Sequence, residues 1–151
     1  MQAETRVFLD TSVLFAAVLS ETGGSRLILK LGEASVLQLF VGLRVLQEAE
    51  GVLARKADQH KGRFALLLDR ANIVVGPSPD KGALEQAGAI VDYTPDAYVL
   101  AEAIAASSDY FVSLDRKHLV DNPRAVVLPF PIGTPGDFLA WFRERVQAKT
   151  G

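Results

Sequence analysis

Four acidic side chains, Asp10, Glu48, Asp96 and Asp115, stand at positions where they could act together. Asp10 and Asp115 each end a short apolar run, and the other two lie near the start of segments with helical spacing. Carboxylates that converge repel one another, and this repulsion raises their pKa values unless a cation neutralises the group. Hard divalent cations such as Mg²⁺ and Mn²⁺ prefer oxygen ligands, lower the pKa of water and stabilise charge on a phosphate. If the four acids meet in one crevice, they predict a metal centre suited to the hydrolysis of phosphodiesters.

Each of these acids also has a purely structural interpretation. Asp10 could cap the helix that follows it, and Glu48 could form an exposed ion pair with Arg44, one helical turn earlier. Asp96 could serve only as a favourable charge in the first turn of its helix. Asp115 is harder to explain in this way, because it ends an apolar run within the sequence Ser-Leu-Asp-Arg. Taken singly, the acids leave both interpretations open.

The composition narrows the kinds of site that the chain can form. Its 151 residues include no cysteine, which excludes disulfides, zinc–thiolate sites and cysteine nucleophiles, and its two histidines exclude a histidine-rich metal site. A formal charge of −2 excludes a strongly basic nucleic-acid coat protein, but it does not exclude a nucleic-acid substrate. No signal peptide or membrane-spanning segment is predicted. We therefore expect a single domain over residues 1–151, in a cytoplasmic protein without membrane association.

Short apolar runs alternate with segments of helical spacing along the chain. Strands are predicted over residues 6–10, 36–41, 72–75 and 110–114, and a fifth over 124–128. Helices are predicted from residue 11, over 25–31, 43–56, 59–71, 81–91 and 94–107, and from residue 134 onward. This alternation predicts a mostly parallel sheet of four to five strands that is covered by helices on both faces. The carboxyl ends of such strands form the usual binding crevice, and Asp10 and Asp115 lie there.

Five sequence blocks appear in an order that matches these elements. They are Leu9–Leu14, Val45–Glu48, Asp96–Ala103, Ser108–Asp115 and Thr134–Leu139. Together they resemble the PIN-domain ribonucleases, the family that contains the VapC-type toxins of bacterial and archaeal toxin–antitoxin pairs. The resemblance runs from the first strand to the last helix. It implies a three-layer α/β/α PIN-like fold with a central, mostly parallel sheet of four to five strands.

The resemblance also assigns roles to residues of this chain. Asp10, Glu48, Asp96 and Asp115 would form a catalytic quartet that binds Mg²⁺ or Mn²⁺. Ser12 and Ser113 would lie just behind the ligands and orient a ligand or a water.

The basic residues that follow Asp115 have two interpretations. Arg116 and Lys117 could attract the phosphate backbone of RNA, or they could simply keep a surface loop soluble. Some relatives carry an acid at position 117, so a fifth acid near the metal is either missing here or supplied by Asp121, and the number of ions, one or two, stays open. His118 is not expected to bind the metal, because four carboxylates already complete an oxygen site.

The function that this resemblance implies is that of a metal-dependent endoribonuclease, the toxin of a toxin–antitoxin pair. The implied partners are an RNA substrate, a cognate antitoxin protein and a second copy of the chain in a homodimer, for which Trp141 and Phe142 are candidate contacts. The main alternative is a catalytically inactive PIN-like module that binds RNA or protein. A phosphatase of the haloacid-dehalogenase type also begins with an Asp at the end of its first strand, but its chemistry needs a second Asp where this chain has Ser12.

Overall fold

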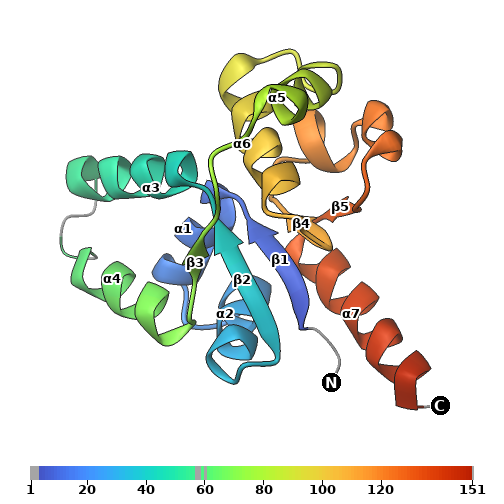
Figure 1. The fold of residues 1–151 in the computed structure, drawn as a ribbon. Helices are drawn as coiled ribbons and strands as arrows, with labels where there is room; N and C mark the ends of the chain where they lie inside the picture. Colours follow the sequence, from blue (N-terminus) through green and yellow to red (C-terminus); the bar gives the residue numbers. More distant parts are fainter. Residues whose placement is uncertain (1–3, 57–58, 60, 151) are drawn as a thin grey trace.

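A sheet of five parallel strands forms the centre of the computed structural model, which describes residues 4–56, 59 and 61–150 (Figure 1). In spatial order the strands are β3 (Val74–Val75), β2 (Leu37–Val41), β1 (Thr5–Leu9), β4 (Tyr110–Val112) and β5 (Ile132–Gly133). Every neighbouring pair is parallel, and helices flank the sheet. The predicted three-layer α/β/α fold with a sheet of four to five strands is therefore confirmed.

All of the helices except the last connect successive strands, and the helices pack around the sheet. They are α1 (Thr11–Leu19), α2 (Gly24–Glu33), α3 (Leu43–Lys56), α4 (Lys61–Arg70), α5 (Lys81–Gly88), α6 (Thr94–Ala105) and α7 (Pro135–Thr150). A π-helical turn, η2 (Arg116–Val120), and a 3₁₀ helix, η3 (Pro123–Val127), lie between β4 and β5. Helix α1 packs against α2 and α3, and α5 packs against α6.

The order of the strands creates a switch point beside β1. From β1 the chain moves outward through β2 and β3, and it then returns to the other side of β1 to form β4 and β5. Strand β1 therefore pairs with both β2 and β4, and Val7 lies opposite Leu39 on one side and Tyr110 on the other. Ligands of parallel sheets bind in the crevice at such a switch point, at the carboxyl ends of the strands. Asp10 and Asp115 lie just beyond the carboxyl ends of the two strands concerned.

Aromatic side chains fill much of the core around β1, β4 and α7. The rings of Phe8 and Phe111 meet edge to face with their centroids 5.3 Å apart, and both side chains are fully buried. Tyr110 contacts Trp141 with centroids 4.9 Å apart. Trp141 and Phe142, on which the expected dimer contact depended, are thus partly buried against the core of their own chain.

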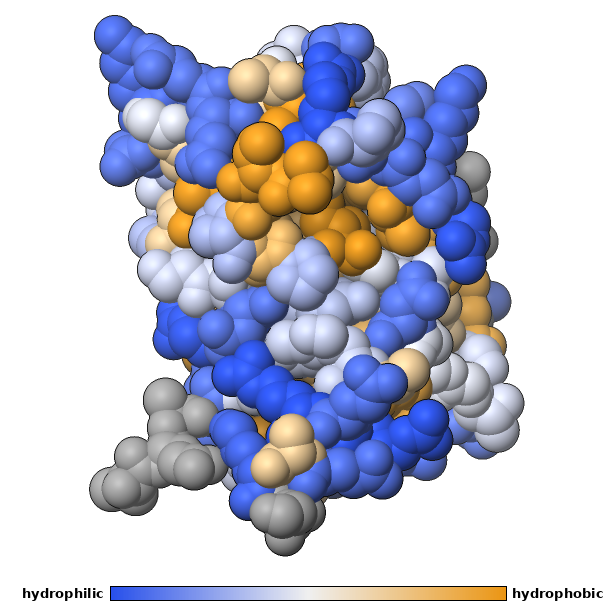
Figure 2. Space-filling model, turned by 90° about the vertical axis from the view of Figure 1, so that its right-hand side faces the viewer, coloured by the Kyte–Doolittle hydropathy of each residue, from blue (hydrophilic) through white to orange (hydrophobic). Residues whose placement is uncertain are grey.

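The fifth strand lies elsewhere than predicted. Residues 124–128 do not form a strand; most of them lie in η3, and the strand that pairs with β4 is β5. The local sequence explains this difference, because the side chain of Asn122 accepts the N–H of Arg124 at 2.9 Å and Pro123 fits the first helical position. The apolar run that suggested a buried strand instead faces outward, with Val126 85% and Val127 70% exposed. Figure 2 shows one area of the molecular surface where apolar side chains gather, bordered by hydrophilic ones.

Within the described residues, no single helix is long and apolar enough to cross a membrane. Only α1 and α2 taken together, which meet at a bend of 92°, reach the necessary length and composition.

We predict that the contact between Phe8 and Phe111 is a major contribution to stability. Replacement of Phe111 by Ala removes a fully buried ring and should lower the free energy of unfolding, measured in urea, by about 3–5 kcal/mol. Val126→Ala, at an exposed position of similar chemistry, should change it by less than about 0.5 kcal/mol. Equal stability of the two variants would contradict this account of the core.

Candidate metal centre

The acids at the ends of β1 and β4 are brought together by strand pairing. The backbone N–H of Asp10 donates to the carbonyl of Val112 at 3.0 Å, which continues the ladder between the two strands by one residue. Beyond this bond the chains separate, β1 into helix α1 and β4 into the segment that carries Ser113 and Asp115. Because both strands run in the same direction, their terminal side chains meet at one edge of the sheet.

Ser113 links the two strand-end acids directly. Its hydroxyl donates to Asp10 Oδ2 at 2.7 Å and accepts the backbone N–H of Asp115 at 3.0 Å. The other oxygen of Asp10, Oδ1, accepts the N–H of Thr11 at 2.9 Å, so Asp10 also caps α1. Ser12 has a different role, because its hydroxyl accepts the N–H of Leu114 at 3.1 Å and so holds the segment after β4 without contacting an acid.

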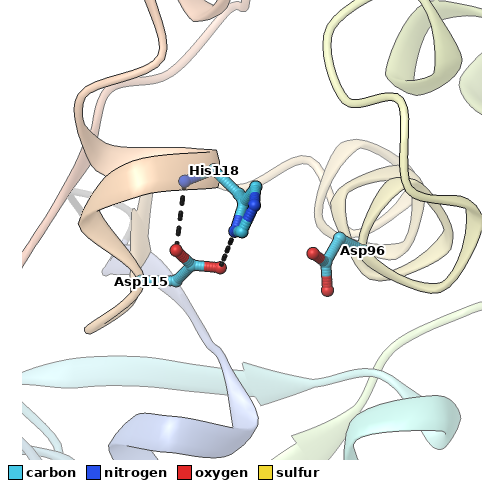
Figure 3. Close-up of side chains that lie close together, drawn as sticks. All are labelled: Asp96, Asp115 and His118. Carbon is cyan, nitrogen blue, oxygen red and sulfur yellow. Dashed lines mark hydrogen bonds and ion pairs between the residues drawn. The ribbon is translucent and has the colours of Figure 1, made fainter.

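Asp96, Asp115 and His118 form the tightest cluster of candidate ligands among the described residues. One ligand atom from each of the three lies within 4.8 Å of the other two. Figure 3 shows Asp115 and His118 side by side at the start of η2, with Asp96 approaching them from α6. His118 Nδ1 lies 3.1 Å from Asp115 Oδ2, and the backbone N–H of His118 donates to Asp115 Oδ1 at 3.0 Å.

His118 is not predicted from the sequence to bind the metal, yet it lies in the cluster of candidate ligands. Its position three residues after Asp115 is the sequence feature that could have indicated it. Asp115 caps η2, and a capping side chain lies close to the residue three positions later.

Glu48 faces the same region from α3 but lies outside that cluster. Its Oε1 pairs with Arg44 Nε at 3.1 Å, and its Oε2 accepts the hydroxyl of Thr11 at 3.1 Å. The ion pair with Arg44 is therefore present, and at the same time Glu48 contacts the residue next to Asp10. Thr11 was missed as a site residue, because nothing in the sequence shows which residue its hydroxyl meets.

The pKa values of Asp10 and Asp96 are raised, mainly by burial and further by neighbouring negative charges. Burial raises the pKa of Asp10, hydrogen bonds from Ser113 and Thr11 oppose that rise, and the charges of Asp96 and Glu48 add to it. Burial also raises the pKa of Asp96, followed by repulsion from the charge of Asp115. Asp10, Glu48, Asp96 and Asp115 thus share one electrostatic environment.

These residues fit a hard divalent cation. Carboxylate oxygens dominate the donor set, and His118 adds one nitrogen. Burial and mutual repulsion disfavour the charged forms of Asp10 and Asp96, and a bound cation would offset both effects. Asp121, the candidate for a fifth acid, lies 3.8 Å from Arg116 as an ion-pair partner.

A surface groove of about 450 Å³ adjoins the cluster and is lined by Tyr93, Lys117, His118 and Arg124, among others. Lys117 thus lines a concave surface beside the acids, whereas Arg116 is engaged by Asp121. The guanidinium of Arg124 is held by both oxygens of Asp92, at 3.2 and 3.3 Å.

Comparison with known proteins gives one family match. Residues 6–117 match the family model described as PIN domain. No curated protein matches the chain.

The fold is shared with several solved structures, among them the following three. VapBC2 from Rickettsia felis, bound to a DNA fragment from its promoter, is similar with a TM-score of 0.62 at 15% identity, over 85% of this chain and 97% of that one. VapBC-1 from nontypeable Haemophilus influenzae gives a TM-score of 0.60 at 12% identity, over 87% and 99%. PAE2754 from Pyrobaculum aerophilum gives 0.52 at 14% identity, over 90% and 88%.

We predict that removal of the charge of Asp96 stabilises the metal-free protein. The pKa of Asp96 is raised in the folded state, so the charged carboxylate lowers the free energy of unfolding. This destabilisation is absent below the ordinary Asp pKa of about 3.9, and it is complete once the pH exceeds the raised pKa. Asp96→Asn should therefore raise the urea midpoint at pH 7, and the gain should shrink as the pH approaches 4.

The same substitution should weaken the binding of Mn²⁺, measured by calorimetry. Asp69→Asn, which removes an exposed acid from α4, is the control and should leave both quantities unchanged. The account would be wrong if Asp96→Asn bound Mn²⁺ as tightly as the unaltered protein, or if it were less stable than the control at pH 7.

Proposed function

The chain belongs to the PIN-domain family, and from this membership together with its acid cluster we propose that it is a metal-dependent endoribonuclease. The observation that carries the proposal is the meeting of Asp96, Asp115 and His118 beside Asp10, at the switch point of the sheet. Among the described residues this is the place where at least three candidate metal ligands lie together.

Asp10, Asp96 and Asp115 would hold Mg²⁺ or Mn²⁺, with Glu48 as the fourth acid of the centre. When bound, such an ion activates water for attack and stabilises negative charge on a phosphate. Ser113 fixes the orientation of Asp10, and Thr11 with Arg44 fixes that of Glu48. Ser12 would contribute less directly, through the segment that leads to Asp115.

The substrate would be RNA, cleaved at a phosphodiester bond. Lys117 lies in the groove beside the acids and would attract the phosphate backbone, with Arg116 next to it. A protein with a formal charge of −2 makes few such contacts, which favours an exposed RNA element over indiscriminate binding.

We propose further that the protein is the toxin of a toxin–antitoxin pair and acts in the cytoplasm as a single domain over residues 1–151. The fold that it shares with structures described as VapBC supports this role. A cognate antitoxin would then cover the acid cluster, and a basic side chain of that partner would pair with the carboxylates.

The alternative is an inactive PIN-like module that binds RNA or protein without cleavage. It is disfavoured because the cluster keeps its acids at a separation that fits a cation. The two functions differ in one outcome, which is cleavage itself.

The purified protein should cleave RNA when Mg²⁺ or Mn²⁺ is present and should lose this activity in EDTA. Asp10→Asn and Asp115→Asn should each lower the cleavage rate by at least about 100-fold, since each removes a ligand of the proposed ion. Asp69→Asn, at an exposed position of α4, should cleave like the unaltered protein. Cleavage without a divalent ion, or cleavage that survives both substitutions, rules out this mechanism; RNA binding without cleavage would favour the inactive module.

The protein should also form a homodimer, as the family resemblance implies. Sedimentation equilibrium should then give twice the chain mass of 16.3 kDa. A mass of one chain at high protein concentration would contradict the dimer while leaving the ribonuclease proposal intact.

A further inference from the structure

Glu102 is an acid in the interior that the proposed reaction does not use. It lies on α6, six residues after Asp96, and its side chain is only 2% exposed. Its Oε1 is also the one buried side-chain oxygen or nitrogen of the described residues that has no hydrogen-bond partner. A buried carboxyl group with an unpaired oxygen costs stability, so its presence calls for a physical reason.

The reason is a contact with the first turn of α3. Glu102 Oε2 accepts the backbone N–H of Arg44 at 3.2 Å, and the N–H of Leu43 also donates to the carboxyl group. The first N–H groups of a helix have no partner within the helix, and Glu102 supplies one from a different helix. It therefore caps α3 across a separation of 58 residues.

Gly42 makes this close approach possible. A Cβ at position 42 would lie between 2.1 and 2.3 Å from the carboxyl atoms of Glu102, which no real contact allows. The residue that precedes α3 and the acid on α6 are thus fitted to each other. Any side chain at position 42 would displace the carboxyl group.

The capped turn leads directly to Glu48. Arg44 receives the cap through its backbone and holds Glu48 through its side chain, at 3.1 Å. The helix that supplies the cap, α6, also carries Asp96. One buried side chain therefore joins the two helices that bring Glu48 and Asp96 to the metal centre.

We propose that Glu102 is a positioning residue: by capping α3 from α6, it sets where Glu48 lies relative to Asp96. The inference rests on the proposed function insofar as Glu48 and Asp96 serve a metal centre. The contact between Glu102 and the first turn of α3 is shown independently by the hydrogen bonds and by the close fit of Glu102 against Gly42. Glu102 does not touch the substrate or the ion.

The first test compares Glu102→Ala with Glu102→Gln. The Ala variant loses the acceptor, so amide exchange at Leu43 and Arg44 should become faster and the affinity for Mn²⁺ should fall by about 10-fold. In RNA cleavage its kcat should fall while KM stays unchanged. Burial raises the pKa of Glu102 and so favours its uncharged form, which Gln resembles. In Glu102→Gln, the amide exchange rates, the Mn²⁺ affinity and kcat should therefore all lie within about threefold of those of the unaltered protein.

Ser108→Ala is the matched control for loss of stability. Ser108 is also a buried polar residue next to α6, and its hydroxyl donates to the carbonyl of Ala103 on α6 at 2.8 Å. This variant should lower the melting temperature without changing the affinity for Mn²⁺.

The second test approaches the contact from the other side and serves if Glu102→Ala fails to fold. Gly42→Ala should displace the carboxyl group and lower the affinity for Mn²⁺, whereas Gly51→Ala on α3, where an added Cβ meets nothing within 4 Å, should not. Since both changes act on one contact, the double variant Gly42→Ala/Glu102→Ala should bind Mn²⁺ no more weakly than Glu102→Ala alone.

Mn²⁺ affinity equal to that of the unaltered protein in both Glu102→Ala and Gly42→Ala overturns the proposal and leaves Glu102 with a role in stability only. If the unaltered protein binds Mn²⁺ but cleaves no RNA, the ribonuclease proposal fails, while a loss of Mn²⁺ affinity in Glu102→Ala still supports the positioning role. If the unaltered protein binds no Mn²⁺, both proposals are wrong, because there is no centre to position.

Discussion

The pairing of β1 with β4 is the constraint on which the candidate site depends. Parallel strands end on the same edge of a sheet. Because the chain returns from β3 to β4, the central strand β1 pairs with a strand that lies about a hundred residues later in the sequence. The ladder ends with the bond from Asp10 to Val112, and the residues after it are free to turn their side chains toward each other. Ser113 then converts this backbone proximity into a fixed arrangement of two acids. The other members of the site come from helices that the same sheet holds in place.

Several features of the site oppose stability. Asp10 and Asp96 have raised pKa values because they are partly buried and face other negative charges, and Glu102 carries a buried oxygen without a partner. A chain selected for stability alone would place apolar or amide side chains at such positions. Partly buried acids that lie close together, with Asp10 held by hydrogen bonds from Ser113 and Thr11, are what a cation-binding centre requires. The unfavourable electrostatics and the proposed chemistry thus have the same origin.

The sequence predicts part of this site. The residues that follow from local patterns can be predicted, whereas those that depend on contacts between distant segments cannot. Asp10 and Asp115 could be placed because apolar runs define strands locally and parallel strands share an edge. The strand expected over residues 124–128 was wrong because the capping of a 3₁₀ turn by Asn122 outweighs the apolar character of the valines, whose exposure only the tertiary structure shows. Glu102 could not be singled out, since it looks like one polar residue in an apolar helix until Gly42 is seen against it. Contacts between distant segments, such as Thr11 with Glu48, have no local signature.

The central claim is that the acids at the switch point bind one divalent cation or more. Anomalous diffraction at the manganese edge, from crystals grown with Mn²⁺, tests it most directly. The account predicts an anomalous peak within bonding distance of oxygens of both Asp96 and Asp115, at about 2.0–2.3 Å. A structure at saturating Mn²⁺ with no peak at these two carboxylates, or with the ion bound elsewhere, would contradict it.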